Sequence, residues 1–171
     1  MTEKIVDAFK YFPIVHNAQW VYKEVGGPGL LHVRLEVGPE TERGLELYFH
    51  YHDVPEEDLW LRHLRLRDNE VYLVDRFGDE EGPILRLPMS VEQNWVYHTN
   101  RQMVVRCFMV EVGEVDVPAG HFEDVIKVEY QYSSGFSEAE FYAPGVGLVG
   151  YIERYEDEDK VFQLVKVVME A

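Results

Sequence analysis

The stretch LLHVRLEVG, residues 30–38, alternates apolar and polar side chains with a period of two residues. Leu31, Val33, Leu35 and Val37 share one face, and the polar side chains between them share the other. Because successive side chains of a β-strand point to opposite faces of a sheet, this alternation is typical of a strand with one buried face. The stretch therefore predicts a half-buried β-strand.

The same period continues along most of the chain. In GLELYFHYH, residues 44–52, the apolar side chains of Leu45, Leu47, Phe49 and Tyr51 lie on one predicted face. Turn-forming residues separate the segments, and short connections favour antiparallel neighbours. We predict further strands in EDLWLRHLRLR (57–67), EVYLVDRF (70–77), NWVYHT (94–99), QMVVRCFMVEVG (102–113), FEDVIKVEYQY (122–132), FSEAEFYA (136–143), GLVGYIERY (147–155) and KVFQLVKVV (160–168).

Helical patterns are confined to two short segments. Apolar residues at helical spacing predict a short N-terminal helix over residues 2–12, and residues 90–93 fit a Ser-x-x-Gln capping box. About ten or eleven regularly spaced strands predict an all-β fold, which is an antiparallel barrel, a half-open barrel or a sandwich. A chain of 171 residues fits one domain, so we assign residues 1–171 to a single β-domain.

One phrase of the sequence occurs twice. PIVHNAQWVY (13–22) and PMSVEQNWVY (88–97) share a Pro-x6-Trp-Val-Tyr frame, and LEVG in the first half matches VEVG in the second at the same offset. Two agreements in one register favour an internal repeat, with related β-meanders over residues 13–87 and 88–168. The alternative is that strands rich in aromatic and β-branched residues resemble one another by composition.

Aromatic residues open the strand in both copies of the phrase. Trp20 and Trp95 are each followed by a tyrosine, Tyr22 or Tyr97, two residues later. We favour core anchors, because an indole buries roughly 150–250 Å² and can close one end of a core. Ligand binding is the alternative, since a barrel lined by these four side chains could hold an apolar molecule with polar ends.

Charge and cysteine content restrict the partners and the chemistry. A net charge of −16 argues against nucleic acid and against anionic membrane surfaces, because both need clustered Lys and Arg. An apolar small molecule or a protein partner stays open. No segment has the length of a transmembrane helix or the composition of a secretory signal, so we expect a cytoplasmic protein. The single cysteine, Cys107, lies in an apolar run and predicts a buried thiol.

The C-terminal half carries motifs that resemble a known group. VDVPAGHFEDVIKVEY (115–130) and AEFYAPGVGLVGYIERY (139–155), with the opening YFPIVHNAQWVY (11–22), resemble uncharacterised bacterial all-β proteins, many of them lipoproteins. The group shares a Pro-x6-Trp-x-Tyr start, a Val-Pro-Ala-Gly-x-Phe turn and a Tyr-Ala-Pro-Gly-Val-Gly-Leu-Val hairpin. The resemblance implies an antiparallel fold like the half-open barrels of lipoprotein carriers, an envelope location for many members and no catalytic residue.

Two details of this resemblance can be tested in a structure. Asn17 stands where the group usually has glycine, so we expect a left-handed backbone at this position. Pro144 and Gly145 suit the two central positions of a type II turn. The chain also departs from the group, because it has no leader and no lipid-attachment cysteine in the sequence as written.

A metal site is the second interpretation. In GLELYFHYHDVPEE, His50 and His52 lie two residues apart on a predicted strand and therefore project to the same face. With Glu56 or Glu57 nearby, and His121 elsewhere, they resemble the first cupin motif and could bind a divalent metal. The glycine expected after the glutamate is absent, and the histidines lie opposite the apolar face. We therefore favour an exposed polar face.

Other catalytic patterns are absent from the sequence. It contains no Gly-x-Ser-x-Gly elbow and no phosphate-binding glycine loop, and the acidic runs at 56–58, 79–81 and 156–159 match no calcium loop and predict solvated loops. The favoured function is a non-catalytic binding or interaction module without a cofactor, presenting an apolar cavity or a partner-binding face. The alternative is a cupin-like, metal-dependent enzyme.

Overall fold

The computed structural model describes residues 8–51, 60–68, 70–75, 79–86, 94–99 and 103–169. Within these ranges the chain forms one short helix, α1 (Ala8–Tyr11), and one antiparallel sheet of 12 strands. The strands are β1 (Gln19–Glu24), β2 (Leu30–Thr41), β3 (Gly44–Tyr51), β4 (Trp60–Arg67), β5 (Glu70–Val74), β6 (Glu80–Arg86), β7 (Asn94–His98), β8 (Val104–Val117), β9 (Gly120–Tyr132), β10 (Ser137–Ala143), β11 (Gly147–Arg154) and β12 (Asp159–Val168).

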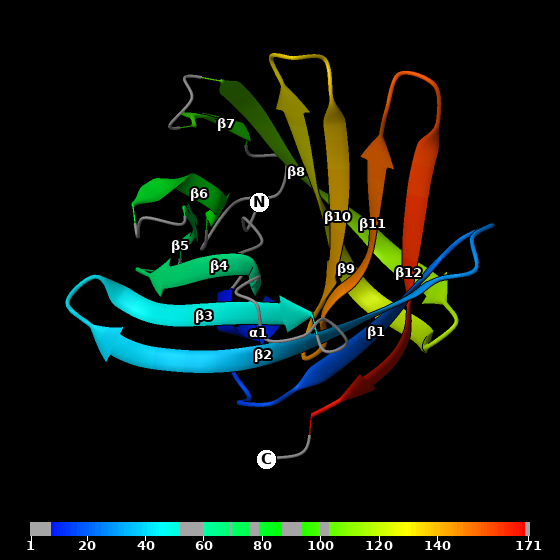
Figure 1. Ribbon diagram of the computed structural model, residues 1–171, viewed down its shortest axis with the longest axis horizontal. Coiled ribbons are helices and arrows are strands. Elements are labelled where there is room, and N and C mark those ends of the chain that lie inside the picture. The colour runs from blue at the N-terminus through cyan, green and yellow to red at the C-terminus, as the bar shows by residue number, and fades with distance from the viewer. Residues whose placement is uncertain are drawn as a thin grey trace, which may run out of the picture.

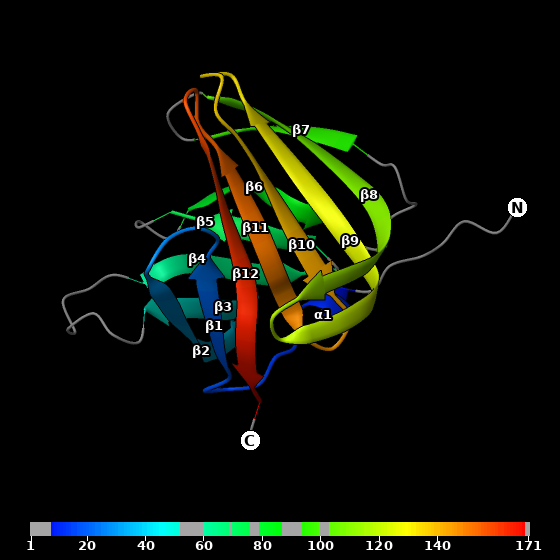
Figure 2. The same cartoon turned by 90° about the vertical axis from the view of Figure 1, so that its right-hand side faces the viewer.

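The strand order divides the sheet into two meanders. It runs β6-β5-β4-β3-β2-β1-β12-β11-β10-β9-β8-β7, so β1–β6 form the first meander and β7–β12 the second. The meanders join where β1 pairs with β12, with Trp20 opposite Val167, and Figure 2 shows these two strands side by side. The first and last strands of the chain therefore hold the two halves together.

The sheet bends strongly between its two halves. Figure 1 shows β2, β3 and β4 running across the view, whereas β10, β11 and β12 run nearly upright. Adjacent strands twist with a fixed hand, and β-bulges increase the bend locally. Register shifts of this kind lie between Val21 and Tyr22 and between Phe141 and Tyr142. The result is a half-open barrel, which confirms the all-β fold predicted from the sequence.

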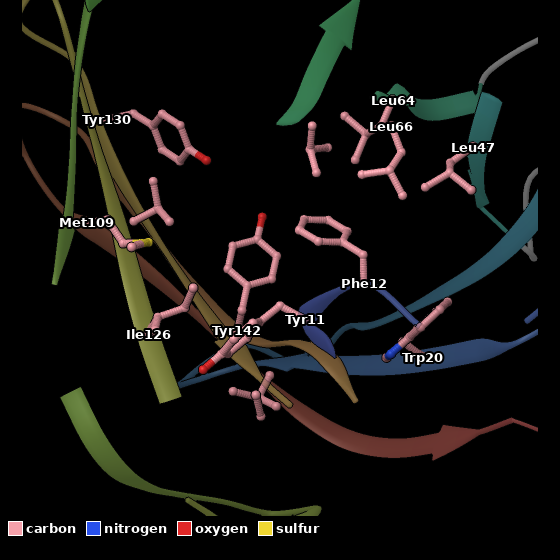
Figure 3. Close-up of a cluster of buried hydrophobic side chains, with 14 of the residues drawn as sticks. Tyr11, Phe12, Trp20, Leu47, Leu64, Leu66, Met109, Ile126, Tyr130 and Tyr142 are labelled. Atoms are coloured by element: carbon pink, nitrogen blue, oxygen red, sulfur yellow. The ribbon is translucent and has the colours of Figure 1, made fainter. Parts of the chain in front are cut away.

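Both meanders contribute to one core. Figure 3 shows Leu47 and Leu64 of the first meander on one side of the interior, and Met109, Ile126 and Tyr130 of the second on the other. All five side chains are buried. Apolar area removed from water stabilises the fold by roughly 25 cal/mol per Å². The two halves therefore stabilise each other through a shared interior.

The N-terminal segment enters this interior. Tyr11 and Phe12, at the end of α1, are buried, and the Tyr11 hydroxyl donates a hydrogen bond to the Asp124 carbonyl at 2.8 Å. The Phe12 ring packs against Tyr142 with ring centres 5.0 Å apart. A short helix was predicted here, and the part of it that precedes Ala8 lies outside the described residues, as does the predicted capping box at 90–93.

The edges of the sheet meet without pairing. Strands β6 and β7 are the two edges, and no hydrogen-bonded ladder joins them among the described residues. Gly82 of β6 instead lies against Tyr97 of β7, so closely that a Cβ added to Gly82 would be 2.6 Å from the Tyr97 Cβ. Because Gly82 also has a φ of 147°, glycine fits this contact better than any other residue. We call this contact between β6 and β7 the seam.

The long β8–β9 hairpin folds over the outside of the second meander. Gly113 has a φ of 91°, and the register of the pair shifts on both sides of it. Beyond this bend the Ala119 amide, at the tip, donates to the Leu164 carbonyl of β12 at 2.9 Å. The tip therefore covers part of the outer face of the second meander, as Figure 2 shows from the side.

Most of the local predictions agree with the structure. Each strand predicted from the period of two is present within the described residues, Asn17 has a φ of 68°, and the Cys107 side chain is fully buried. Gly145 has a φ of 75°, and the Val146 amide donates to the Ala143 carbonyl at 3.2 Å, as a type II turn requires.

One strand, β6, was not predicted. Its sequence, EEGPILR, contains glycine and proline, which are typical of turns. The prediction of a solvated loop at 79–81 is wrong for Glu80, because Glu80 begins β6 and accepts hydrogen bonds from Arg65 and Arg67 at 3.1 and 2.9 Å. These two guanidinium groups hold the pKa of the Glu80 carboxyl below its ordinary value, against the opposing effect of its burial.

The repeated phrase lies in the first strand of each meander. Trp20 of β1 is opposite Val33 of β2, and Trp95 of β7 is opposite Cys107 of β8. Both indoles are buried in the core. These positions match what a duplication would produce, and common descent of the two halves stays a prediction.

Candidate functional site

The half-open barrel encloses a cavity of about 380 Å³. This volume lies within the range of small-molecule sites, about 300 to 1,000 Å³. Apolar side chains of the first meander form one wall, namely Leu31, Val33, Leu35, Leu47, Leu64 and Leu73. Because these residues alternate along their strands with polar ones, the period of two that predicted the strands also produces this wall.

Aromatic side chains form much of the remaining surface. They include Trp20, Tyr22, Phe49, Tyr97, Tyr130 and Tyr142. Three of the four aromatic residues predicted to bind a ligand are thus among the lining side chains. Trp95 is buried in the core but is not one of the described residues that line the cavity.

Hydrogen bonds between the two meanders fix the orientation of the Trp20 and Tyr22 rings. The Trp20 indole Nε1 donates to the Val146 carbonyl at 2.8 Å, and the Tyr22 hydroxyl donates to the Leu148 carbonyl at 2.7 Å. Buried indole and phenol groups need such partners. Both rings therefore present fixed apolar surface to the cavity.

An ion pair spans the interior between the meanders. Arg62 of β4 donates to both carboxylate oxygens of Glu140 on β10, at 2.7 and 3.2 Å. The side chains are 25% and 8% exposed. Burial alone lowers the pKa of a guanidinium, but the Glu140 carboxylate raises the pKa of Arg62 well above its ordinary value. The guanidinium therefore stays charged and bound to Glu140.

Two further carboxylates lie at one end of the cavity. Glu138 of β10 and Glu153 of β11 are directly opposite each other in the sheet and both line the cavity. Like charges in this position destabilise a sheet. Glu138 accepts a hydrogen bond from the Tyr132 hydroxyl at 2.6 Å, and Glu153 accepts one from the Tyr155 hydroxyl.

Aromatic rings surround these carboxylates. Tyr51, Tyr132 and Tyr151 line the same part of the cavity, and after burial the Glu153 carboxylate is a further cause of the raised pKa of Tyr51 and Tyr151. We call Glu138, Glu153 and these three tyrosines the acidic end of the cavity.

The charge of the acidic end is not balanced. Among the described residues no Lys, Arg or His side chain lies within ion-pair distance of Glu138 or Glu153. Burial raises the pKa of Glu138 above its ordinary value, and the Glu140 carboxylate raises it further, whereas the Tyr132 hydrogen bond and Arg62 oppose the shift.

A buried hydroxyl also faces the cavity. Tyr142 is 2% exposed, and its hydroxyl makes no hydrogen bond of acceptable geometry among the described residues. Figure 3 shows the Tyr142 ring extending into the interior, with Tyr130 and Phe12 on either side. Burial and then the Glu140 carboxylate raise the pKa of this phenol well above its ordinary value. The hydroxyl is therefore neutral and lies close to the Arg62–Glu140 pair.

Sequence reasoning did not identify Arg62, Glu138, Glu140 or Glu153. In SEAEFYA, the alternation places Glu138, Glu140 and Tyr142 on one face and Phe141 on the other. Alternation alone suggests that the carboxylates face solvent. Phe141 instead lies with Val115 and Val117 around a smaller cavity of about 170 Å³, which borders the β8–β9 hairpin. Both faces of β10 are therefore covered, and the pattern could not tell which one was interior.

The structure describes two residues of the predicted metal site, His50 and His121, and they lie on different strands, β3 and β9. His50 lies on the face of β3 opposite Leu47 and Phe49, and its Nε2 is 3.8 Å from a Glu36 carboxylate oxygen. His121 lies at the exposed tip of β9 and contacts Asp116 at 2.7 Å. His52, Glu56 and Glu57 lie outside the described residues.

His121 has other acidic neighbours. Within the described part of the chain, Glu114, His121 and Glu123 are grouped closely enough to share a cation, and all three are exposed. The Asp116 hydrogen bond raises the pKa of His121 above its ordinary value. His50 does not belong to this group.

Comparison with known proteins identifies the fold. A crystal structure from Bacteroides fragilis, of a protein predicted to be exported and described as having a YmcC-like fold, matches with a TM-score of 0.55 and 14% identity over 92% of this chain and 98% of that one. A predicted lipoprotein from Parabacteroides distasonis matches with a TM-score of 0.53 and 14% identity over the same shares. No protein-family model and no curated protein matches the sequence.

At this identity the likeness shows the fold alone. The chain shares its all-β architecture with uncharacterised bacterial proteins, as the sequence motifs implied. The neighbours are described as an exported protein and a lipoprotein, which gives no support to the cytoplasmic location expected from the sequence. Within the described residues, no helix has the length and hydrophobicity of a membrane span.

Proposed function

We propose that the protein is a non-catalytic binding module, and that it holds a small apolar molecule with a polar end inside the half-open barrel. One observation carries this proposal, the cavity of about 380 Å³ between the two meanders. Aliphatic and aromatic side chains supply most of its lining, and a few polar groups are concentrated on β10 and β11. This composition is typical of small-molecule sites.

The cell envelope is the proposed place of action. Both fold neighbours are described by such a location, one as exported and one as a lipoprotein. An apolar ligand that is poorly soluble in water would need an enclosed carrier in an aqueous compartment, since exposed apolar surface is unfavourable.

Two tryptophan substitutions on neighbouring residues test the proposal. Leu31 lines the cavity, whereas Leu30 is 56% exposed on the same strand, so only Leu31→Trp places an indole inside the barrel. We expect the neutral fluorescent probe N-phenyl-1-naphthylamine to bind wild-type protein and Leu30→Trp with one-to-one stoichiometry. In Leu31→Trp the affinity should fall by about tenfold or more, which is about 1.4 kcal/mol of binding free energy.

Circular dichroism would establish that both variants fold. The proposal is wrong if the wild-type protein does not bind the probe, or if folded Leu31→Trp and Leu30→Trp bind it equally well.

A further inference from the structure

Among the described residues, the charged side chains that line the cavity do not all have a partner of opposite charge. The described lining contains one cation, Arg62, and three carboxylates, Glu138, Glu140 and Glu153. Arg62 is held by both oxygens of Glu140. Such paired contacts are among the stronger interactions of a guanidinium. Arg62 is therefore not free to bind an anion, and the acidic end keeps an excess of negative charge.

This excess is unfavourable in the unbound protein. Glu138 and Glu153 are directly opposite each other, and each accepts a hydrogen bond from a tyrosine hydroxyl group. The raised pKa of Glu138 has the same origin, since its charged form is disfavoured by burial and by nearby carboxylates. A cation placed at the acidic end would remove this cost.

A buried tyrosine of the cavity lining is relevant to a ligand as well. The Tyr142 hydroxyl is buried, faces the cavity and makes no hydrogen bond of acceptable geometry among the described residues. The hydroxyl lies close to the Arg62–Glu140 pair, and a bound donor or acceptor would give this buried group a further hydrogen bond. Tyr142 lies two residues from Glu140 on the strand that also carries Glu138.

The aromatic rings at the acidic end suit one class of head group. Tyr51, Tyr132 and Tyr151 line the cavity there, and the faces of aromatic rings attract cations. Aromatic rings combined with carboxylates recognise amines and quaternary ammonium groups. The aliphatic wall of Leu31, Leu47 and Leu64 would accommodate an apolar chain attached to that group.

We propose that the ligand of this cavity is a cationic amphiphile, a long-chain amine or quaternary ammonium compound whose head group lies between Glu138 and Glu153. This inference rests on the proposed function, because it names the chemistry of the molecule that the cavity holds. An amphiphile with a carboxylate or phosphate head would meet two like charges and no free cation in the described lining.

Three ligands with the same decyl chain test the inference. Decyltrimethylammonium, decanol and decanoate differ in the charge of the head group, and isothermal titration calorimetry below their micelle concentrations gives the affinity of each. At physiological ionic strength we expect the ammonium compound to bind at least about tenfold more tightly than decanoate. Decanol should lie between them.

Variants that remove carboxylates test where the ammonium head group binds. In the double variant Glu138→Gln/Glu153→Gln, the advantage of the ammonium compound over decanol should disappear. Glu42→Gln removes one charge at an exposed site in the β2–β3 turn and should leave all three affinities unchanged. This control separates the acidic end from the general attraction of an anionic protein for cations.

The possible results distinguish the two proposals. If the three ligands bind equally well, or decanoate binds best, the inference about the head group is wrong and the binding function stands. If the double variant still prefers the ammonium compound, the head group does not lie at the acidic end and the inference is also wrong. If neither decanol nor N-phenyl-1-naphthylamine binds, the proposed function itself fails.

Discussion

At the scale of single residues, the Arg62–Glu140 pair is a charged contact between the two walls of the interior. Its two residues come from different meanders, and Glu140 is 8% exposed. Replacing one member of a buried pair leaves an uncompensated charge, whereas replacing both with apolar residues is often neutral. We therefore expect the contribution of the pair to appear when one member alone is replaced.

A double-mutant cycle measures this contribution. We expect Arg62→Met to lower the free energy of unfolding by about 3 kcal/mol, because Glu140 then stays buried without a partner. Arg62→Met/Glu140→Met should recover most of this loss. The outer-face pair of Arg154 and Glu129, at 2.6 Å, is 33% and 25% exposed, so Arg154→Met should cost less than about 1 kcal/mol. Urea denaturation gives all of these values, and an equal loss in Arg62→Met and Arg154→Met would contradict the account.

Glu138 should destabilise the unbound protein at neutral pH. Its pKa in the folded state is raised, by burial first and by Glu140 second, so the folded protein holds this proton to a higher pH than the unfolded chain. The protonated Glu138 carboxyl stabilises the fold below its pKa in the unfolded chain. This stability is lost as the pH rises through its pKa in the folded state. The charged groups that face Glu138 are Glu140 on the same strand, Glu153 on β11 and Arg62 on β4.

The Glu138→Gln variant tests whether the Glu138 carboxylate destabilises the fold at neutral pH. It should unfold at a higher temperature than wild-type protein at neutral pH, and the difference should shrink as the pH falls toward the ordinary pKa of a glutamate. Thermal unfolding followed by circular dichroism across this pH range is sufficient. A variant that is less stable than wild type at neutral pH would show that the carboxylate is favourably bound in the unliganded fold.

At the scale of strands, the seam brings the two edges of the sheet into contact. Strand β6 contacts β7 through Gly82 and Tyr97 without a described ladder of hydrogen bonds. Contacts of this kind separate more easily than a paired ladder. Tyr97 also lines the cavity, so the seam borders the proposed ligand site.

Gly82→Ala should weaken the seam. The added methyl group would lie 2.6 Å from the Tyr97 Cβ, and overpacking of this kind typically costs about 1–3 kcal/mol. Gly29→Ala is a matched control, because nothing lies within 4 Å of a Cβ at that position, and it should change the stability by less than about 0.5 kcal/mol. Chemical denaturation of both variants provides the comparison, and equal stabilities would mean that the seam is not closely packed.

The strands also show what the sequence could predict. The alternation in residues 30–38 and 44–52 gave the correct strands and the correct interior face, because one side of each strand meets the shared core. The same reasoning failed for β10, whose two faces are both covered, and for β6, whose glycine serves the contact with Tyr97 rather than a turn. Arg62 could not be found, because its partner lies 78 residues away on the opposite wall.

At the scale of the whole molecule, the two meanders share one core and leave a cavity of about 380 Å³ between them. Trp20 and Trp95 occupy equivalent strands, and both are buried. Only Trp20 is among the described lining residues of the cavity. The repeated phrase therefore describes two anchors of the fold, one of which also borders the proposed ligand site.

The indole N–H signals of Trp20 and Trp95 test the central claim most directly. In a ¹H–¹⁵N correlation spectrum, with signals assigned through Trp20→Phe and Trp95→Phe, the protein would be titrated with decanol. A molecule bound in the cavity should move the Trp20 signal progressively until it saturates, and leave the Trp95 signal in place. A Trp20 signal that stays unchanged at saturating decanol would contradict the claim that the barrel interior is a binding site.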